Sequence, residues 1–285
     1  HYAQVLQSNG KCEDAARWYK EYMTKSYDVK RDFVLDCEVL NEFKESEVDL
    51  ENLADLNTEN LDFSPIPFND GVIFTSNRGT NNLTQRKDNW TSGNFSDLFF
   101  SKKKKDGGFE KIEILDGEIN GKFHDGVPTF NRAGTLMIFT RTNKKGKNRD
   151  GNRLLKLYSA QNQDGFWANV EELPINSDDF SNCHPTLSPD GRRLYFASDR
   201  DEGYGGMDLY MSENVGGSWR DPVNLGPAVN SQGNEVFPFI SEDETLYFSS
   251  NGHLGLGGLD VFSVKKGIEE NENTWNIREN MGRPF

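Results

Sequence analysis

The sequence predicts a mainly β protein, a β-propeller of four-stranded antiparallel blades, preceded by an α-helical N-terminal part. Two observations predict the propeller. Residues 188–264 contain one series of landmarks twice, and the series can be followed back so that four units are visible. Each unit alternates apolar and polar residues between Gly- and Asn-rich segments, as half-buried strands do. A repeat of roughly fifty residues with such strands is typical of propellers, because stacked blades cover each other's faces.

Five landmarks define the repeat. Each unit has an asparagine, a proline, an apolar run that ends in phenylalanine, a third strand and an aromatic residue that opens a fourth strand. We expect the aromatic landmarks to fill the space between blades, since aromatic side chains supply most buried area there. In chain order the landmarks are Asn57, Asn120, Asn176 and Asn230; Pro65, Pro128, Pro185 and Pro238; Phe74, Phe139, Phe196 and Phe248; Asp97, Lys156, Asp208 and Asp260; and Phe109, Trp167, Trp219 and Trp275.

The residues before the blades have helical patterns. Residues 1–23 indicate the end of one helix, a turn at Asn9-Gly10 and a second helix, and residues 30–43 indicate a further helix. Gly10, Ala15, Tyr19 and Tyr22 have the spacing of a tetratricopeptide repeat. The alternative is an ordinary two-helix segment. We therefore expect a tetratricopeptide-like domain to end at residues 1–44, and the propeller to occupy residues 45–285.

Residues 46–53 precede Asn57 as fourth-strand segments precede the later asparagines. We interpret Val48 to Leu53 as a strand that closes the ring by pairing with a blade other than the first. The chain ends in the fourth strand of the fourth unit, where a four-bladed ring has no need of this strand. We therefore expect more blades after Phe285 and a propeller that is incomplete at its C-terminus.

Composition excludes several classes of function. The 285 residues carry a net charge of −14 with a pI near 4.8, which argues against nucleic acid, because phosphate binding needs clustered Lys and Arg. No apolar run approaches the ~18 residues of a membrane span. The chain begins at His1 without a visible signal peptide, so we expect an excerpt or a processed chain. Cys12, Cys37 and Cys183 have no metal-site spacing, and we expect buried free thiols rather than a bridge between the first two.

One repeat position carries acidic residues. Three residues before the landmark prolines stand Asp62, Asp125, Asn182 and Glu235. If each proline begins the innermost strand, these side chains lie at the mouth of the central channel, where they could attract a cation or a basic peptide. The alternative, which we favour, is that each accepts hydrogen bonds from a neighbouring blade, from Arg78, Arg141 or Arg200.

The sequence predicts no metal or cofactor. Asp199, Asp201 and Glu202 lie among glycines but do not match the twelve-residue calcium loop. His124 and His184 precede channel prolines, and we take this position as incidental rather than as a metal site. Three acids that begin third strands are expected to cap the glycine-rich turns, namely Asp97, Asp208 and Asp260.

The sequence also predicts no catalysis. It contains no G-x-S-x-G, H-E-x-x-H or phosphate-binding glycine loop. A pair of carboxylates of the glycosidase type stays open as an alternative.

A partner surface is expected on one face of the propeller. The loops from second to third strands and the links between blades emerge together there, and these loops are long and variable. The opposite hairpins, such as 69–71 and 189–191, are short turns. Binding residues concentrate on loops held by a rigid scaffold. The candidate partner-binding residues on the long-loop face are Arg78, Trp90, Lys144, Lys145, Arg200, Tyr204 and His253.

Four motifs carry a family resemblance. S-P-D-G-R-R-L-Y-F-A-S-D-R from Ser188, G-Y-G-G-M-D-L-Y from Gly203, W-x-x-P-x-N-L-G from Trp219 and N-E-x-x-P from Asn234 resemble the PD40, or WD40-like, repeat of TolB-like periplasmic propellers. Tetratricopeptide helices followed by this propeller are similar to PorE-type outer-membrane lipoproteins of the type IX secretion and gliding machinery. The second unit departs from the pattern at Lys156 and at Thr140-Arg141-Thr142.

The resemblance implies a non-enzymatic scaffold in the periplasm, associated with the outer membrane and bound to protein partners of a type IX secretion or gliding assembly. In that family an OmpA-like domain usually follows, so peptidoglycan binding is expected only through a domain that this chain lacks. Two alternatives stay open, a propeller hydrolase that uses channel carboxylates and a TolB-like or lectin-like binding module.

Overall fold

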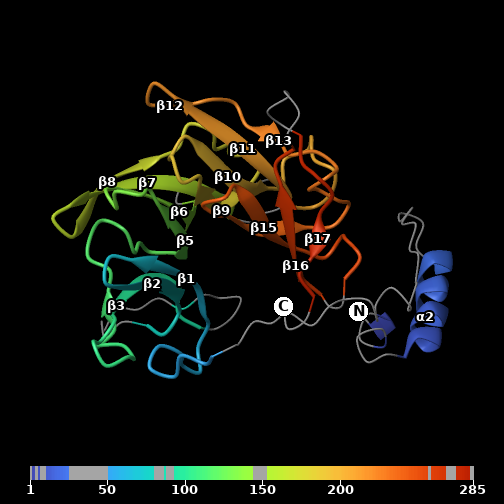
Figure 1. The fold of residues 1–285 in the computed structure, drawn as a ribbon, viewed down its shortest axis with the longest axis horizontal. Helices are drawn as coiled ribbons and strands as arrows, with labels where there is room; N and C mark the ends of the chain where they lie inside the picture. The colour runs from blue at the N-terminus through green and yellow to red at the C-terminus, as the bar shows by residue number, and fades with distance from the viewer. Residues whose placement is uncertain are drawn as a thin grey trace.

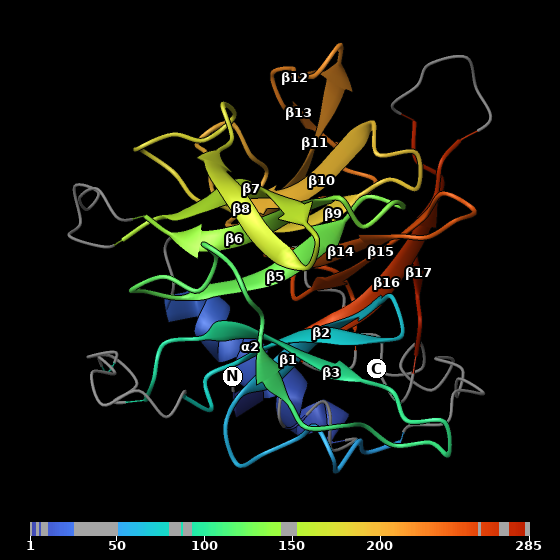
Figure 2. The same cartoon turned by 90° about the vertical axis from the view of Figure 1, so that its left-hand side faces the viewer.

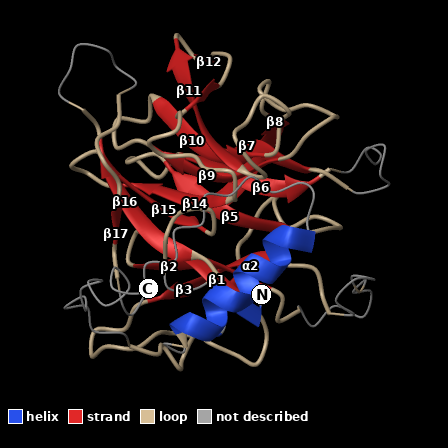
Figure 3. Ribbon diagram, turned by 90° about the vertical axis from the view of Figure 1, so that its right-hand side faces the viewer, coloured by secondary structure: helices blue, strands red, loops and turns tan. Residues whose placement is uncertain are grey.

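The computed structural model describes residues 11–25, 51–79, 93–143, 153–255, 258–267 and 274–282, together with Tyr2, Ala3, Leu6 and Lys87. Within these ranges the chain forms helix α2 (Cys12–Lys25) and four antiparallel sheets whose first strands meet at a common centre (Figure 1). Figure 3 shows α2 beside a body made of strands. The predicted mainly β, propeller-like arrangement of four blades is therefore confirmed. No helix among the described residues has the length and apolar character needed to cross a membrane.

Each blade is one sheet whose successive strands are neighbours, except that the last strand of blade 3 pairs with the third strand of that blade. In Figure 2 the sheet of blade 1 lies below that of blade 2. Blade 1 contains β1 (Asp62–Phe68), β2 (Gly71–Ser76), β3 (Asp97–Lys102) and β4 (Glu113–Ile114); blade 2 contains β5 (Asp125–Phe130), β6 (Leu136–Thr142), β7 (Leu155–Gln163) and β8 (Phe166–Glu172); blade 3 contains β9 (Asn182–Leu187), β10 (Arg193–Ser198), β11 (Asp208–Val215), β12 (Ser218–Trp219) and β13 (Val223–Asn224); blade 4 contains β14 (Glu235–Ile240), β15 (Thr245–Ser250), β16 (Asp260–Lys265) and β17 (Glu279–Asn280).

The landmark prolines lie inside the innermost strands and not at their start, which corrects the expectation from sequence. The register of each innermost strand shifts at its proline, and the residue before the proline has a left-handed backbone. Proline has no N–H to continue the ladder, so a bulge forms there. The four left-handed residues are Ser64 (φ 50°), Val127 (φ 47°), His184 (φ 54°) and Phe237 (φ 51°).

The same bulges join neighbouring blades. The hydroxyl of Thr75 on β2 accepts the Val127 N–H at 3.0 Å, and that of Thr140 on β6 accepts the His184 N–H at 3.0 Å. Gly126 permits this approach, because a Cβ there would lie 2.7 Å from the Thr75 methyl group. Each threonine hydroxyl thus accepts a backbone N–H that the bulge has left unpaired in the sheet of the next blade.

Aromatic landmarks fill the space between blades, as predicted. Phe139, Phe196, Phe248 and Trp167 are among the largest fully buried side chains of the described chain. The Trp167 ring lies 5.9 Å from that of Phe68 and 5.5 Å from that of Phe130, so it packs blade 2 against blade 1.

The landmark asparagines hold the links between blades. Asn120, Asn176 and Asn230 each accept an N–H and donate to the C=O of one third-strand leucine at 2.7–3.2 Å. The side-chain amide of each asparagine thus pairs with the third strand as a peptide group of a neighbouring strand would. This explains why the landmark asparagines have a near-constant spacing in the repeat. Asn57 bonds instead to Asn52 at 2.6 Å.

The predicted closing strand is wrong for its described part. Residues 51–53 are not in a strand, and residues 48–50 lie outside the described chain. The Leu53 carbonyl accepts the N–H groups of Leu56 and Asn57, which makes a turn, and Leu56 is buried in the core of blade 1. Asp55 accepts the Phe109 N–H at 3.1 Å. The segment therefore packs on blade 1, the blade it was expected to avoid.

The N-terminal part is helical where it is described. Tyr2, Ala3 and Leu6 have helical backbone ahead of α2, and the Tyr2 and Trp18 rings meet edge to face at 5.3 Å. The predicted helix over residues 30–43 lies outside the described residues. Cys12 is disulfide-bonded, which corrects the expected free thiol, whereas Cys183 is a buried free thiol as predicted.

Candidate binding site at the centre of the propeller

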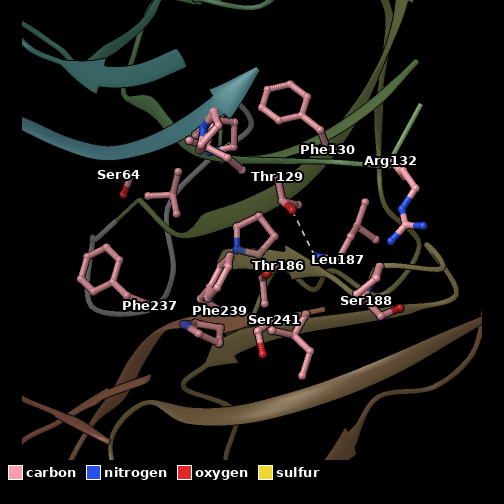
Figure 4. Close-up of a pocket in the computed structure, with 18 of the residues that line it drawn as sticks. Ser64, Thr129, Phe130, Arg132, Thr186, Leu187, Ser188, Phe237, Phe239 and Ser241 are labelled. Carbon is pink, nitrogen blue, oxygen red and sulfur yellow. Dashed lines mark hydrogen bonds between the residues drawn. The ribbon is translucent and has the colours of Figure 1, made fainter. Parts of the chain in front are cut away.

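A pocket of about 370 Å³ lies where the innermost strands meet (Figure 4). Its walls come from β1, β5, β9 and β14 and from the hairpins that follow the last three. One landmark proline of each blade contributes. The apolar lining residues are Pro65, Ile66, Pro67, Val127, Pro128, Phe130, Pro185, Leu187, Pro189, Phe237, Pro238, Phe239 and Ile240.

Two phenylalanines of β14 line the pocket with partly exposed rings. Phe237 is 40% exposed and Phe239 is 55% exposed. The bulge of β14 lies between them, so the two residues do not follow the ordinary alternation of a strand. Large apolar side chains left open at the centre of a fold are typical of a binding site.

The charges at the pocket's hairpin end are paired across blades. Arg132, after β5, forms an ion pair with Glu242, after β14, which links blades 2 and 4. Arg193 of blade 3 contacts Glu244 of the same β14–β15 hairpin at 3.0 Å. Both pairs join opposite charges, so they leave little net charge at this rim.

Three of the four side chains at the acidic repeat position are bound by arginines. Asp62 pairs with Arg78 at 2.6 Å, Asp125 pairs with Arg141, and Asn182 accepts from Arg200 at 3.1 Å. Three of the four residues thus have an arginine partner among those named from sequence, but the predicted origin of these arginines in a neighbouring blade is wrong. Each arginine belongs to the same blade as its partner and not to a neighbouring one, because the start of a first strand lies opposite the end of the second. None of these side chains lines the pocket.

The fourth residue of this position, Glu235, has no arginine partner across its own hairpin. It accepts from the hydroxyls of Ser231 at 2.6 Å and Ser250 at 2.5 Å, and His253 Nε2 lies 3.8 Å away. Burial raises the pKa of Glu235, and the two serines offset this only in part. For Asp62, burial also opposes ionisation, but hydrogen bonds from Ser76, Arg78 and Thr58 hold its pKa below the ordinary value.

Arginines that were candidate partner contacts pack on aromatic rings of their own blades. The Arg78 guanidinium lies 4.8 Å from the Phe74 ring, and Arg200 lies 4.5 Å from the Tyr210 ring and 4.6 Å from the Phe180 ring. Such cation–π contacts stabilise the blade. The Arg78 side chain is only 12% exposed, so it is not displayed on the loop face.

In blade 4 a histidine occupies the place of the arginine. His253 lies beside the stacked rings of Phe248 and Phe262, and its Nε2–H donates to the Val229 carbonyl at 2.7 Å. Burial lowers the pKa of His253 to about 4, so the ring is neutral near pH 7. The side chain is 4% exposed, which removes His253 from the loop surface. Of the other candidates, Tyr204 is 51% exposed, and Trp90, Lys144 and Lys145 lie outside the described residues.

The first residues of third strands differ between blades. Asp208 accepts the N–H groups of Tyr204 at 2.6 Å and Gly205 at 3.1 Å, which confirms the predicted turn cap. Asn224 of β13 also donates to Asp208, at 2.8 Å. Lys156, the departure noted in blade 2, is buried and pairs with Glu172 at 2.7 Å and Asp178 at 2.6 Å.

Blade 1 carries Ile114 where blade 3 has Asn224, as the registers of their third strands show. Ile114 has no donor, so Asp97 lacks the amide bond that Asp208 receives. Burial, together with the charge of Asp125, raises the pKa of Asp97 to about 7. This carboxyl is partly protonated near neutral pH.

The two histidines near the channel have different surroundings. His124 Nδ1 accepts the Ser96 backbone N–H at 3.1 Å and lies 3.1 Å from the Ser96 hydroxyl, which also donates to the Asp125 carbonyl at 3.1 Å. The His184 ring stacks on Phe237, and burial lowers its pKa to about 4. The described residues contain no group of three side chains placed to hold a metal ion.

The pocket residues are not among the candidates predicted from sequence. Those candidates are the mouth acids, for which a structural role is favoured, and residues of the long-loop face, whereas the pocket is lined by residues around each proline, such as Phe237 and Phe239. The available signal is the apolar residues around the prolines, in D-F-S-P-I-P-F and E-V-F-P-F-I. A bulge that changes the direction of their side chains has no sequence signature of its own.

No protein-family model matches the chain, and no curated protein matches it. Solved structures are similar at the level of the fold. TolB from Acinetobacter baumannii is 16% identical, with a TM-score of 0.45 over 78% of this chain and 44% of that one. A protein of Agrobacterium tumefaciens named as a TolB is 15% identical, with a TM-score of 0.47 over 74% and 61%. A puromycin-hydrolyzing peptidase from Mycobacterium tuberculosis is 14% identical, with a TM-score of 0.44 over 72% and 29%. The chain thus spans less than two thirds of each of these structures.

Proposed function

We propose that this chain is a non-enzymatic binding module within a periplasmic, outer-membrane-associated scaffold. Its partners are proteins of a type IX secretion or gliding assembly. In this proposal residues 1–44 are the end of a tetratricopeptide-like domain that extends the same scaffold, and peptidoglycan is bound by a domain outside this chain. The motifs from Ser188 to Pro238 and their resemblance to PorE-type lipoproteins motivate the assembly named here.

One observation supports the non-enzymatic assignment above the others. Asp62 and Asp125 are ion-paired with arginines of their own blades, and Glu235 is bound by two serines. A glycosidase-type mechanism needs two carboxyl groups that face a shared substrate. These carboxyl groups are bound within their own blades instead, and the one carboxyl group that lines the central pocket among the described residues, that of Glu242, is paired with Arg132.

The second candidate is a TolB-like or lectin-like module for a soluble ligand. The central pocket motivates it, since such ligands bind in concave sites. It differs from the scaffold in where contact occurs, because a scaffold partner is expected on the long-loop face.

A photo-crosslinking amino acid placed at one of two surface positions tests the proposal in the native envelope. Tyr204 lies in the loop between β10 and β11 and is 51% exposed; Val215 ends β11 at the opposite hairpin face and is 48% exposed. We expect a discrete crosslinked protein from position 204 and none from position 215. Crosslinks from 215 alone, or from neither position, would contradict a partner on the long-loop face.

A further inference from the structure

Three of the four residues at one repeat position line the pocket, and the fourth packs on one of them. Ser64, Val127 and Phe237 line it, and the His184 ring stacks on Phe237 with ring centroids 3.9 Å apart. All four have left-handed backbone conformations, and none of them is glycine or asparagine. This conformation is costly for ordinary residues, most of all for β-branched valine. Strain of this kind persists where the surrounding structure enforces it and is concentrated at ligand sites.

The bulges also determine how an occupant can be held. Proline offers no donor, and the N–H groups of Val127, His184 and Leu187 are already bound by threonine hydroxyls at 3.0 Å. A bulged edge with proline does not accept another strand. An occupant is therefore held by its side chain and not by strand addition.

The rim selects against charge. Arg132 is paired with Glu242, and Arg193 is paired with Glu244. A charged ligand would have to separate one of these pairs or enter an apolar wall without a counter-charge. An uncharged apolar group needs neither, and the paired rim supplies the polar border that surrounds the apolar centre of protein interfaces.

We propose that the central pocket binds a bulky uncharged side chain, of the leucine or tryptophan class, that a partner protein presents on a turn or a chain end. The pocket's volume of about 370 Å³ is at the small end of ligand sites, so it takes a side chain and not a folded element. Ser64, Val127 and Phe237 are the residues that set which side chain fits. The site is separate from the long-loop face, so the scaffold has two binding surfaces.

The test uses the full chain and acetylated, amidated pentapeptides Gly-Ser-X-Ser-Gly, with X as Trp, Leu, Lys or Glu. Binding is followed by two-dimensional NMR of the protein. We expect the Trp and Leu peptides to shift resonances of residues that line the pocket, and the Lys and Glu peptides to bind at least tenfold more weakly. Equal binding of all four peptides, or shifts confined to residues outside the pocket, overturns the proposal, as does no binding at all.

Three variants distinguish specific binding in the pocket from nonspecific binding to exposed apolar side chains. Phe239→Ser removes an exposed wall residue and should weaken Trp-peptide binding at least tenfold. Phe239→Leu keeps an apolar wall and should bind nearly as the native chain does. Phe166→Ser is the matched control, because Phe166 is 42% exposed on β8, outside the pocket. Unchanged binding in Phe239→Ser, or an equal loss in Phe166→Ser, contradicts the site, and a thermal melt verifies that each variant is folded. Because the readout is at the pocket, this test is independent of the crosslinks from position 204.

Discussion

The His184 imidazole lies flat against the Phe237 ring, with centroids 3.9 Å apart and planes inclined by 16°, and so joins the innermost strands of blades 3 and 4. Burial lowers the pKa of His184 to about 4. We expect Phe237→Ala to admit water and to raise this pKa toward the ordinary value of 6.5. An NMR pH titration of His184 measures it, with Phe239→Ala as the control. A pKa that stays near 4 in Phe237→Ala means that Phe237 does not shield the ring.

Val127 should be a site where a polar substitution does not destabilise the fold. Its φ of 47° is costly for a β-branched residue, and asparagine tolerates this region. We expect Val127→Asn to raise the free energy of unfolding in urea by up to about 1 kcal/mol. Val223→Asn is the control, because Val223 does not have a left-handed backbone, and its free energy of unfolding should not increase. A loss in Val127→Asn larger than in the control contradicts the strain argument.

A buried and an exposed ion pair should contribute differently to the free energy of unfolding. Arg141 and Asp125 are 3% and 0% exposed, whereas Arg132 and Glu242 are 70% and 76% exposed. Arg141→Met leaves a buried carboxylate without its partner and should cost about 3–5 kcal/mol in urea denaturation. Arg132→Met should cost about 0–1 kcal/mol. Similar losses in the two variants would show that the Asp125–Arg141 pair does not hold blade 2.

The sequence predicted the blades well because each landmark acts locally. The prolines, aromatic residues and asparagines mark strand centres, core positions and links, and the structure uses them so. It predicted arginine donors for the acidic repeat position but expected them from neighbouring blades, whereas a hairpin places the start of β1 beside the end of β2, so that Arg78 binds Asp62 within one blade. The pocket was missed for a different reason, because left-handed backbone at Ser64 and Val127 depends on packing between blades.

The stability of the chain should fall as pH rises through the range in which the Asp97 carboxyl is protonated in the folded chain but ionised in the unfolded chain. Its pKa is about 7 in the folded chain against an ordinary 3.8, so the folded state keeps a proton that the unfolded state has lost. The free energy of unfolding therefore decreases between about pH 4 and pH 7 and is level outside that window for this group.

Asp97→Asn removes the titrating group and isolates this effect. We expect the melting temperature of Asp97→Asn to match that of the native chain near pH 4 and to exceed it above pH 7. Asp164→Asn, at an exposed turn, serves as the control. A difference that is constant with pH, or larger at pH 4, contradicts the raised pKa.

We propose above all that partners bind the long-loop face of a non-enzymatic propeller. Shortening the loop from Thr80 to Gly93 tests it most directly, with capture of the partner crosslinked at position 204 measured beside thermal stability. We expect capture to weaken at least tenfold while the melting temperature stays nearly unchanged, because the deletion leaves β2 and β3 intact. If the shortened chain captures the partner normally and substitutions at Asp70 and Asp190 abolish capture, the binding surface lies on the hairpin face and the claim is wrong.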